Sequence, residues 1–232
     1  MGKLLIAAAY AVYAAFWIRF LMHLLVWWSA ARRQMPGAQL NPGSRTQVWV
    51  LTAFDVLLLG RLINVNAALW AGEWVFHASF LLVLLRHLRF FLNPIPGWVW
   101  LLQTPGLVAG YILPFSLIYI LVVRLLTKHE KYASPANMFL LAVALIISSA
   151  GVLMHALIKP DLVAVKLFAF GIVSVSPAPA PASILFFVHF VLVLLLVLLL
   201  PTHILTAPLV MLEARRQEQA LRNVMHGPYE PR

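Results

Sequence analysis

Residues 72–91 read GEWVFHASFLLVLLRHLRFF, and this stretch decides the fold class. It is mostly apolar over about 20 residues, the length that a helix needs to cross the hydrocarbon core of a membrane. It also contains His77 and His87, ten residues apart. A polar ring inside a span needs a partner, because unpaired polar groups are costly in hydrocarbon. The stretch therefore predicts a membrane helix that carries functional side chains.

The composition of the whole chain gives the same fold class. Of the 232 residues, 63% are hydrophobic and 10% are charged, whereas soluble domains carry about 25% charged residues. We expect one all-α polytopic membrane domain with little mass outside the bilayer. The net charge of +10 is assigned to cytoplasmic loops and not to nucleic-acid binding. The absence of cysteine excludes disulfides, thiolate zinc sites, cysteine-ligated iron–sulfur clusters and covalently attached c-type haem.

Five apolar segments are long enough to span a membrane. We predict them at residues 4–30, 73–92, 99–125, 137–158 and 183–205. They belong to a membrane domain over residues 1–212, which is followed by a polar cytoplasmic tail over residues 213–232. Residues 48–70 are also apolar but include Asp55 and Arg61. These charges favour an interfacial helical segment there over a sixth span.

The distribution of lysine and arginine predicts the orientation. Five spans with the N-terminus outside and the C-terminus in the cytoplasm put eleven of these residues inside and five outside. The inner set is Arg32, Arg33, Arg45, Arg61, Arg124, Lys128, Lys131, Arg215, Arg216, Arg222 and Arg232, and the outer set is Lys3, Arg86, Arg89, Lys159 and Lys166. A sixth span would move three of the inner arginines outside and remove the asymmetry.

Four histidines predict two haem sites. His77 and His87 lie about 15 Å apart along the second span, and His189 and His203 about 21 Å apart along the fifth, offset by about 40°. These spans are antiparallel, so His77 shares the cytoplasmic depth with His203, and His87 shares the outer depth with His189. A b haem takes two neutral imidazoles from opposite faces. The alternative is that these rings only form hydrogen bonds between helices.

Other polar side chains in the spans have weaker assignments. Arg86 and Arg89 flank the outer ligand and either pair with haem propionates or quinone oxygens, or extend to the interface. Glu73 is either a hydrogen-bond acceptor for His77 or an interfacial acid. His23 is interpreted as structural or propionate-binding and His155 as structural. His129 and His226 are assigned to solvated regions.

Three stretches resemble a known family: the stretch quoted above, DVLLLGRLINVNAALW at residues 55–70, and VHFVLVLLLVLLLPTHILTAP at residues 188–208. They are similar to the membrane cytochrome b subunits typified by the gamma subunit of respiratory nitrate reductase. They resemble still more closely the DsrM-type subunit of the dissimilatory sulfur-metabolism redox complex. The resemblance implies five helices, two b haems on the same four histidines, and menaquinone or ubiquinone as substrate.

The last two ligands are about one helical turn closer together than in the nitrate reductase subunit. No lysine occurs at the matching part of the third span, so quinone-site residues do not carry over.

We therefore expect a subunit that transfers electrons between the quinone pool and a cytoplasmic partner, by oxidising quinol or reducing quinone. A chain without cysteine needs another subunit to hold iron–sulfur clusters, and the resemblance implies one like heterodisulfide reductase within a larger membrane complex. The expected location is the cytoplasmic membrane of a bacterium or archaeon. The alternatives are a subunit of another quinol-linked oxidoreductase, such as nitrate reductase, or a haem-free transporter or anchor subunit.

Overall fold

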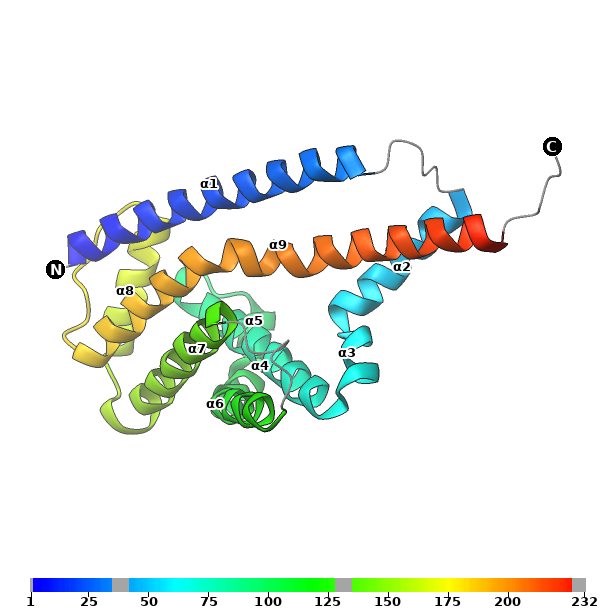
Figure 1. Ribbon diagram of the computed structural model, residues 1–232. Helices are drawn as coiled ribbons and strands as arrows, with labels where there is room; N and C mark the ends of the chain where they lie inside the picture. Colours follow the sequence, from blue (N-terminus) through cyan, green and yellow to red (C-terminus); the bar gives the residue numbers. More distant parts are fainter. Residues whose placement is uncertain (1, 35–41, 128–134, 227–232) are drawn as a thin grey trace. The chain divides into compact units, whose positions relative to one another are not determined.

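The computed structural model describes residues 2–34, 42–127 and 135–226, and within these ranges the chain is helical along most of its length, with no strand. Figure 1 shows the helices in chain order. They are α1 (Gly2–Gln34), α2 (Pro42–Leu57), α3 (Gly60–Val65), α4 (Ala67–Phe91), α5 (Gly97–Leu101), α6 (Gln103–Leu126), α7 (Pro135–Leu153), the π-helical turn η2 (Met154–Ile158), α8 (Leu162–Val173) and α9 (Ile184–His226). The predicted all-α class is confirmed for the described residues.

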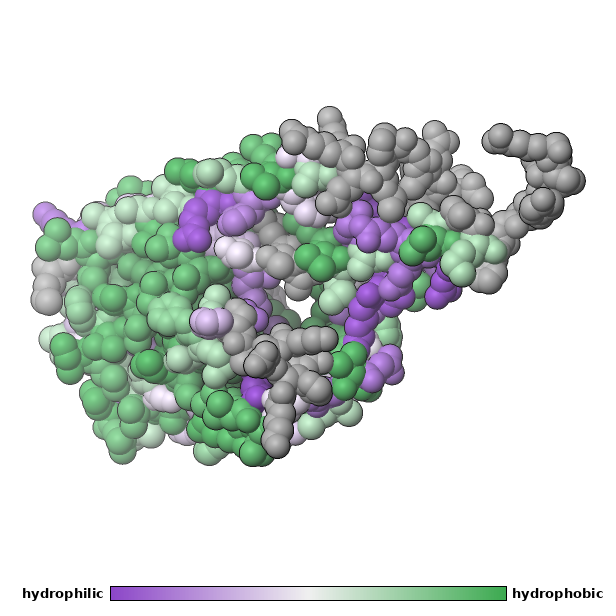
Figure 2. Space-filling model, in the orientation of Figure 1, coloured by the Kyte–Doolittle hydropathy of each residue, from purple (hydrophilic) through white to green (hydrophobic). Residues whose placement is uncertain are grey.

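Within the residues that the structure describes, five helices are long and apolar enough to cross a membrane, which confirms the predicted number. Their candidate spans are Gly2–Ala30, Ala67–Phe91, Gln103–Leu126, Pro135–Ile158 and Ile184–Arg222. Only 17% to 33% of the most apolar window of each is buried inside the protein. The remaining apolar surface suits lipid, and Figure 2 shows an almost entirely hydrophobic face over α7, α8 and the start of α9. The chain is thus a multi-pass membrane protein.

The stretch over residues 48–70 is broken and supplies no sixth span. Its longest apolar helical part, Thr46–Leu57, is shorter than a crossing requires. Leu59 adopts a positive φ of 52°, which separates α2 from α3. The side chain of Asn66 then accepts a hydrogen bond from the Leu69 amide at 2.9 Å and caps the start of α4. The second span therefore begins earlier than predicted.

Contacts along the chain group the described residues into two compact units. The first contains Met1–Ala15 and Asn66–Leu199, and the second contains Phe16–Val65 and Leu200–Arg232. Both α1 and α9 contribute to each unit. The predicted division between a membrane domain and a tail at residue 213 stays a prediction, and α9 is continuous through that position.

In the first unit, α4 and α6 form a tightly packed antiparallel hairpin (Figure 1). A Cβ atom at Gly106 would lie 2.7 Å from the Cβ of Arg86, and one at Gly72 would lie 2.6 Å from the ring of Tyr119. Glycine at both ends therefore lets the two helices approach closely. Close packing does not require glycine at position 110, because the atom nearest to an added Cβ there would be 3.8 Å away.

The same unit has an aromatic core that joins α1, α8 and α9. Leu5 and Ile6 of α1 pack with Phe168 of α8 and Phe186 of α9. The rings of Phe168 and Phe186 lie edge to face, with their centroids 5.6 Å apart. This core fixes the first turns of α9, the part that carries His189.

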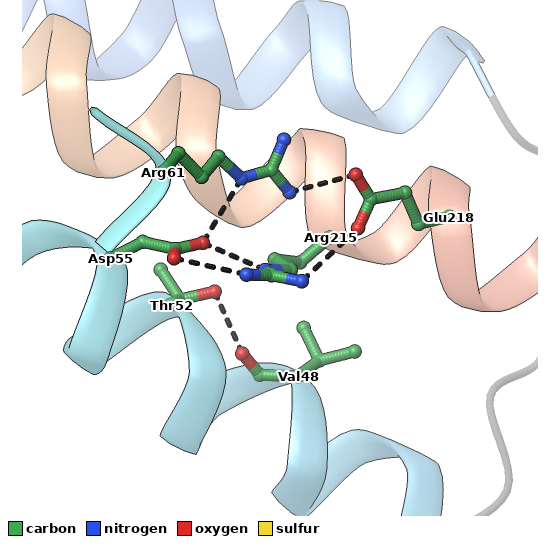
Figure 3. A network of polar contacts seen from close by, with 6 residues as sticks. All are labelled: Val48, Thr52, Asp55, Arg61, Arg215 and Glu218. Atoms are coloured by element: carbon green, nitrogen blue, oxygen red, sulfur yellow. Dashed lines mark hydrogen bonds and ion pairs between the residues drawn. The ribbon is translucent and has the colours of Figure 1, made fainter. Parts of the chain in front are cut away.

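In the second unit, a buried carboxylate joins α2 and α3 to the end of α9 (Figure 3). Asp55, whose side chain is 1% exposed, accepts two hydrogen bonds from Arg215, at 2.7 and 2.9 Å, and one from Arg61 at 3.1 Å. Glu218 pairs with both arginines. Burial raises the pKa of Asp55, but hydrogen bonds from Arg215 and then Arg61 outweigh it and hold that pKa below its ordinary value. The network anchors the last part of α9, which carries Arg215 and Glu218.

Candidate functional site

Two predicted ligands, His77 and His87, are held in the same way on α4. The Nδ1 of His77 lies 2.7 Å from the carbonyl oxygen of Glu73, and the Nδ1 of His87 lies 2.7 Å from that of Val83. Each contact spans one helical turn. A carbonyl oxygen can only accept, so Nδ1 carries the proton in both rings.

His189 is oriented across two helices. Its Nδ1 lies 3.1 Å from the carbonyl oxygen of Ile147 on α7. One turn along α7, a Cβ atom at Gly151 would come within 3.5 Å of the His189 ring. The ring therefore packs directly on the α7 backbone, and the same tautomer follows as for the two histidines of α4.

This tautomer leaves the Nε2 lone pair of His77, His87 and His189 available to a metal ion. Iron in a b haem takes its axial bonds from such neutral imidazoles, and a hydrogen bond from the other ring nitrogen fixes the ring and raises its basicity. The ring orientations thus fit the predicted ligand role. The described residues contain no group of three or more metal-binding side chains, whereas a bis-histidine haem needs only two.

The predicted ligands are divided between the two units. His87 of α4 and His189 of α9 both belong to the first unit, and their pairing about one haem stays a prediction. His203 lies on α9 in the second unit and is exposed. The pairing of His77 with His203 therefore stays a prediction.

Three arginine side chains near the α4 ligands have unused buried donors. The Nε atoms of Arg86, Arg89 and Arg124 are buried and have no hydrogen-bond partner within the described part of the chain. Arg89 does donate to the side-chain oxygen of Gln103 at 2.7 Å and lies over the ring of Phe90. Buried cationic donors of this kind fit an anionic group, and haem propionates are such groups.

Glu73 was predicted to be either a hydrogen-bond acceptor for His77 or an interfacial acid, and its backbone and its side chain have different partners. The backbone carbonyl accepts from His77, as described above. The carboxylate instead pairs with Arg124 at 2.6 Å, and its other oxygen is 3.9 Å from the Nδ1 of His77. Arg124 was assigned only to the inner charge set by sequence reasoning, so its part in holding the turn before His77 was missed.

The remaining histidines lie apart from these contacts. The Nε2 of His23 lies 3.3 Å from the Thr202 hydroxyl oxygen, within the second unit. The Nδ1 of His155 lies 3.0 Å from the hydroxyl oxygen of Tyr111, within the first. His129, Lys128, Lys131 and Arg232 fall outside the described residues, and the side chain of His226 is not described.

Sequence reasoning also missed Ile147, Gly151 and Tyr111. Gly151 of α7 packs against His189 of α9, and only the three-dimensional structure shows this contact. The hydroxyl of Tyr111 gives no signal in sequence, because tyrosine is common in membrane helices.

Side chains and spans together define a helical membrane protein in which three histidines of the spans use Nδ1 for a backbone carbonyl. Two curated proteins are similar to the chain, and both are described as an Hdr-like menaquinol oxidoreductase cytochrome b-like subunit. The protein from Archaeoglobus profundus is 33% identical over 159 residues, which cover 58% of this chain and 47% of the relative. The protein from Archaeoglobus fulgidus is 34% identical over 109 residues, 42% of this chain and 33% of the relative.

These relatives support a DsrM-type cytochrome b subunit, as the resemblance predicted, and neither name refers to the gamma subunit of nitrate reductase. The chain spans less than half the length of the curated relatives it matches. No protein-family model matches the chain, and no solved structure matches it.

Proposed function

We propose that this chain is a cytochrome b subunit with two b haems that transfers electrons between the membrane quinone pool and a cytoplasmic iron–sulfur subunit. The observation that carries the proposal is the shared orientation of His77, His87 and His189. All three rings use Nδ1 for a backbone carbonyl and keep Nε2 for a metal ion. The names of the relatives, which combine cytochrome b and menaquinol, support the same function.

Each residue of the proposed sites has a defined task. His87 and His189 hold the outer haem, and His77 and His203 hold the inner haem. Arg86 and Arg89 compensate the charge of the outer haem's propionates or bind a quinone oxygen, and the Glu73–Arg124 pair fixes the helical turn before His77. When bound, each haem supplies a one-electron Fe(III)/Fe(II) couple.

The proposal includes a partner and a membrane orientation. The chain has no cysteine, so an iron–sulfur subunit resembling heterodisulfide reductase supplies the clusters, within a complex of dissimilatory sulfur metabolism. The N-terminus lies outside and the C-terminus in the cytoplasm of a bacterial or archaeal cell. Either menaquinone or ubiquinone is the substrate, and the Hdr-like relatives favour menaquinone.

Haem quantification tests the proposal directly. We expect two b haems per purified chain, measured as the pyridine haemochrome and as a dithionite-reduced minus oxidised spectrum. His87→Ala and His189→Ala should each lose the outer haem, and His77→Ala and His203→Ala the inner one. His23→Ala is the matched control, a histidine of a span outside the proposed ligand set, and it should keep both.

The other outcomes separate the alternatives. A folded protein without haem would exclude a cytochrome and leave a transporter or anchor subunit. One haem per chain that disappears in His87→Ala and persists in His203→Ala would remove His203 from the ligand set. Copurification with nitrate reductase subunits would contradict the proposed sulfur-metabolism partner but not the haem sites.

A further inference from the structure

A hydrogen-bonded pair of polar side chains, Tyr111 of α6 and His155 of η2, is not used by the proposed haem sites. The Tyr111 hydroxyl oxygen lies 3.0 Å from the Nδ1 of His155. Their rings meet edge to face at 85°, with centroids 5.9 Å apart. Both side chains are exposed. In a membrane, this exposure makes the pair accessible to a lipid-soluble ligand.

The local backbone presents His155 in an unusual way. The end of the α7 segment widens into a π-helical turn over Met154–Ile158, and Lys159 closes it with a positive φ of 41°. The turn is closed by a hydrogen bond of 2.8 Å from the Lys159 amide to the carbonyl of Met154. His155 in this turn bonds to Tyr111 of another helix, whereas His77 and His87 bond to the turn before them.

The pair is also linked to the outer ligand by an arginine. Arg86 directly precedes His87 in α4, and it packs on α6, the helix that carries Tyr111. The stem of Arg86 packs over Gly106 of α6, and its Nε is buried without a partner in the described chain. A cation in this position favours an oxygen that loses its proton nearby.

We propose that His155 is the proton acceptor for quinol oxidation and that Tyr111 positions it. In the tautomer with its proton on Nδ1, His155 donates to the Tyr111 oxygen and presents Nε2 to a quinol hydroxyl. This inference rests on the proposed function, which supplies the oxidant.

The reaction balances with these groups. A quinol loses two protons and two electrons to become a quinone. The Nε2 of His155 takes one hydroxyl proton as the O–H bond breaks, releases it to water at the nearby helix end, and then takes the second. The haems that the four predicted histidines would hold would supply the oxidant, since two ferric irons can accept the two electrons of the quinol.

The test compares His155→Gln and Tyr111→Phe with the control Tyr119→Phe in the purified, haem-loaded protein. Tyr119 lies on the same helix and loses only its hydroxyl. Three quantities are measured: haem content, the rate of haem reduction by menadiol, and the dissociation constant of the quinol-site ligand HOQNO by fluorescence quenching. His155→Gln should keep both haems, slow the reduction by menadiol about 100-fold and weaken HOQNO binding about tenfold.

Tyr111→Phe should slow the reduction about tenfold with full haem content, and Tyr119→Phe should match the wild type. Unchanged menadiol rate and HOQNO binding in both test variants would overturn the assignment. Loss of haem in His155→Gln would also overturn it if Tyr111→Phe kept the wild-type rate. A wild-type protein without haem whose HOQNO binding depends on His155 would instead refute the proposed function and support a quinol site at this pair.

Discussion

At the scale of single residues, the histidines proposed as haem ligands are oriented by backbone atoms more than by side chains. His77 and His87 use the carbonyl one turn earlier in their own helix, which any helical histidine can reach. Their orientation therefore follows from the sequence once the helix is predicted. The orientation of His189 does not, because Ile147 belongs to another helix.

Gly151 gives a prediction about this contact. Alanine there would place a methyl group 3.5 Å from the His189 ring, an ordinary van der Waals distance. A leucine side chain would need the space that the ring occupies. We expect Gly151→Ala to keep both haems and Gly151→Leu to lose the outer one, as measured by pyridine haemochrome. Full haem content in a folded Gly151→Leu protein would show that His189 does not hold the haem in this orientation.

Asp55 gives a prediction about pH. Its pKa in the folded protein lies below the ordinary 3.8, so its charged form stabilises the fold. This stabilisation is complete above pH 3.8 and is lost as the pH falls through the lower pKa of the folded state. Asp55→Asn should cost about 2–3 kcal/mol at neutral pH, because it weakens the pairing of a buried carboxylate with two arginines.

Thermal midpoints of the wild type and Asp55→Asn between pH 3 and 7 test this sign. The difference between them should be largest at neutral pH and shrink in acid. Glu213→Gln is the control, since the only partner of that carboxylate in the described network is Gln217 on the same helix. A difference that grows in acid would contradict the lowered pKa.

At the scale of elements, close packing of α4 on α6 depends on particular glycines. Gly106 and Gly110 are four residues apart, a spacing typical of close helix packing, but only Gly106 has no room for a side chain. The sequence could not distinguish the two glycines, because which of them faces α4 depends on how α4 and α6 pack together.

The two glycines therefore provide a matched pair of variants. Gly106→Ala would bring a Cβ within 2.7 Å of Arg86 and 3.1 Å of the Leu82 carbonyl, and should destabilise the protein by about 1–3 kcal/mol. Gly110→Ala should be neutral or stabilise by up to about 1 kcal/mol, because alanine favours helix. Thermal unfolding followed by circular dichroism measures both. Equal effects would mean that the hairpin is looser than the structure shows.

At the scale of the whole molecule, the number of spans and their order could be predicted because both follow from length and hydrophobicity. The ends of the spans could not. The fifth span is predicted to end at residue 205, whereas the helix α9 continues to His226, and Asp55 contacts its later part through Arg215. This contact joins residues that are distant in the sequence, so no local sequence pattern predicts it. The helix α8 was also missed, since its 12 residues are too few to span.

The orientation of the chain in the membrane can be tested because the protein has no cysteine of its own. Gly97 lies in α5 with no atom within 4 Å of an added Cβ, so a single cysteine is tolerated there. Gln217 is exposed on the part of α9 beyond residue 205, where the fifth span is predicted to end. Three spans separate these positions, and they should therefore lie on opposite sides of the membrane.

A membrane-impermeant maleimide should label Gly97→Cys in intact cells, and Gln217→Cys only after permeabilisation. The reverse result would invert the predicted orientation, placing the larger set of lysines and arginines outside, against the usual charge bias. Labelling of both from one side would contradict the number of spans itself.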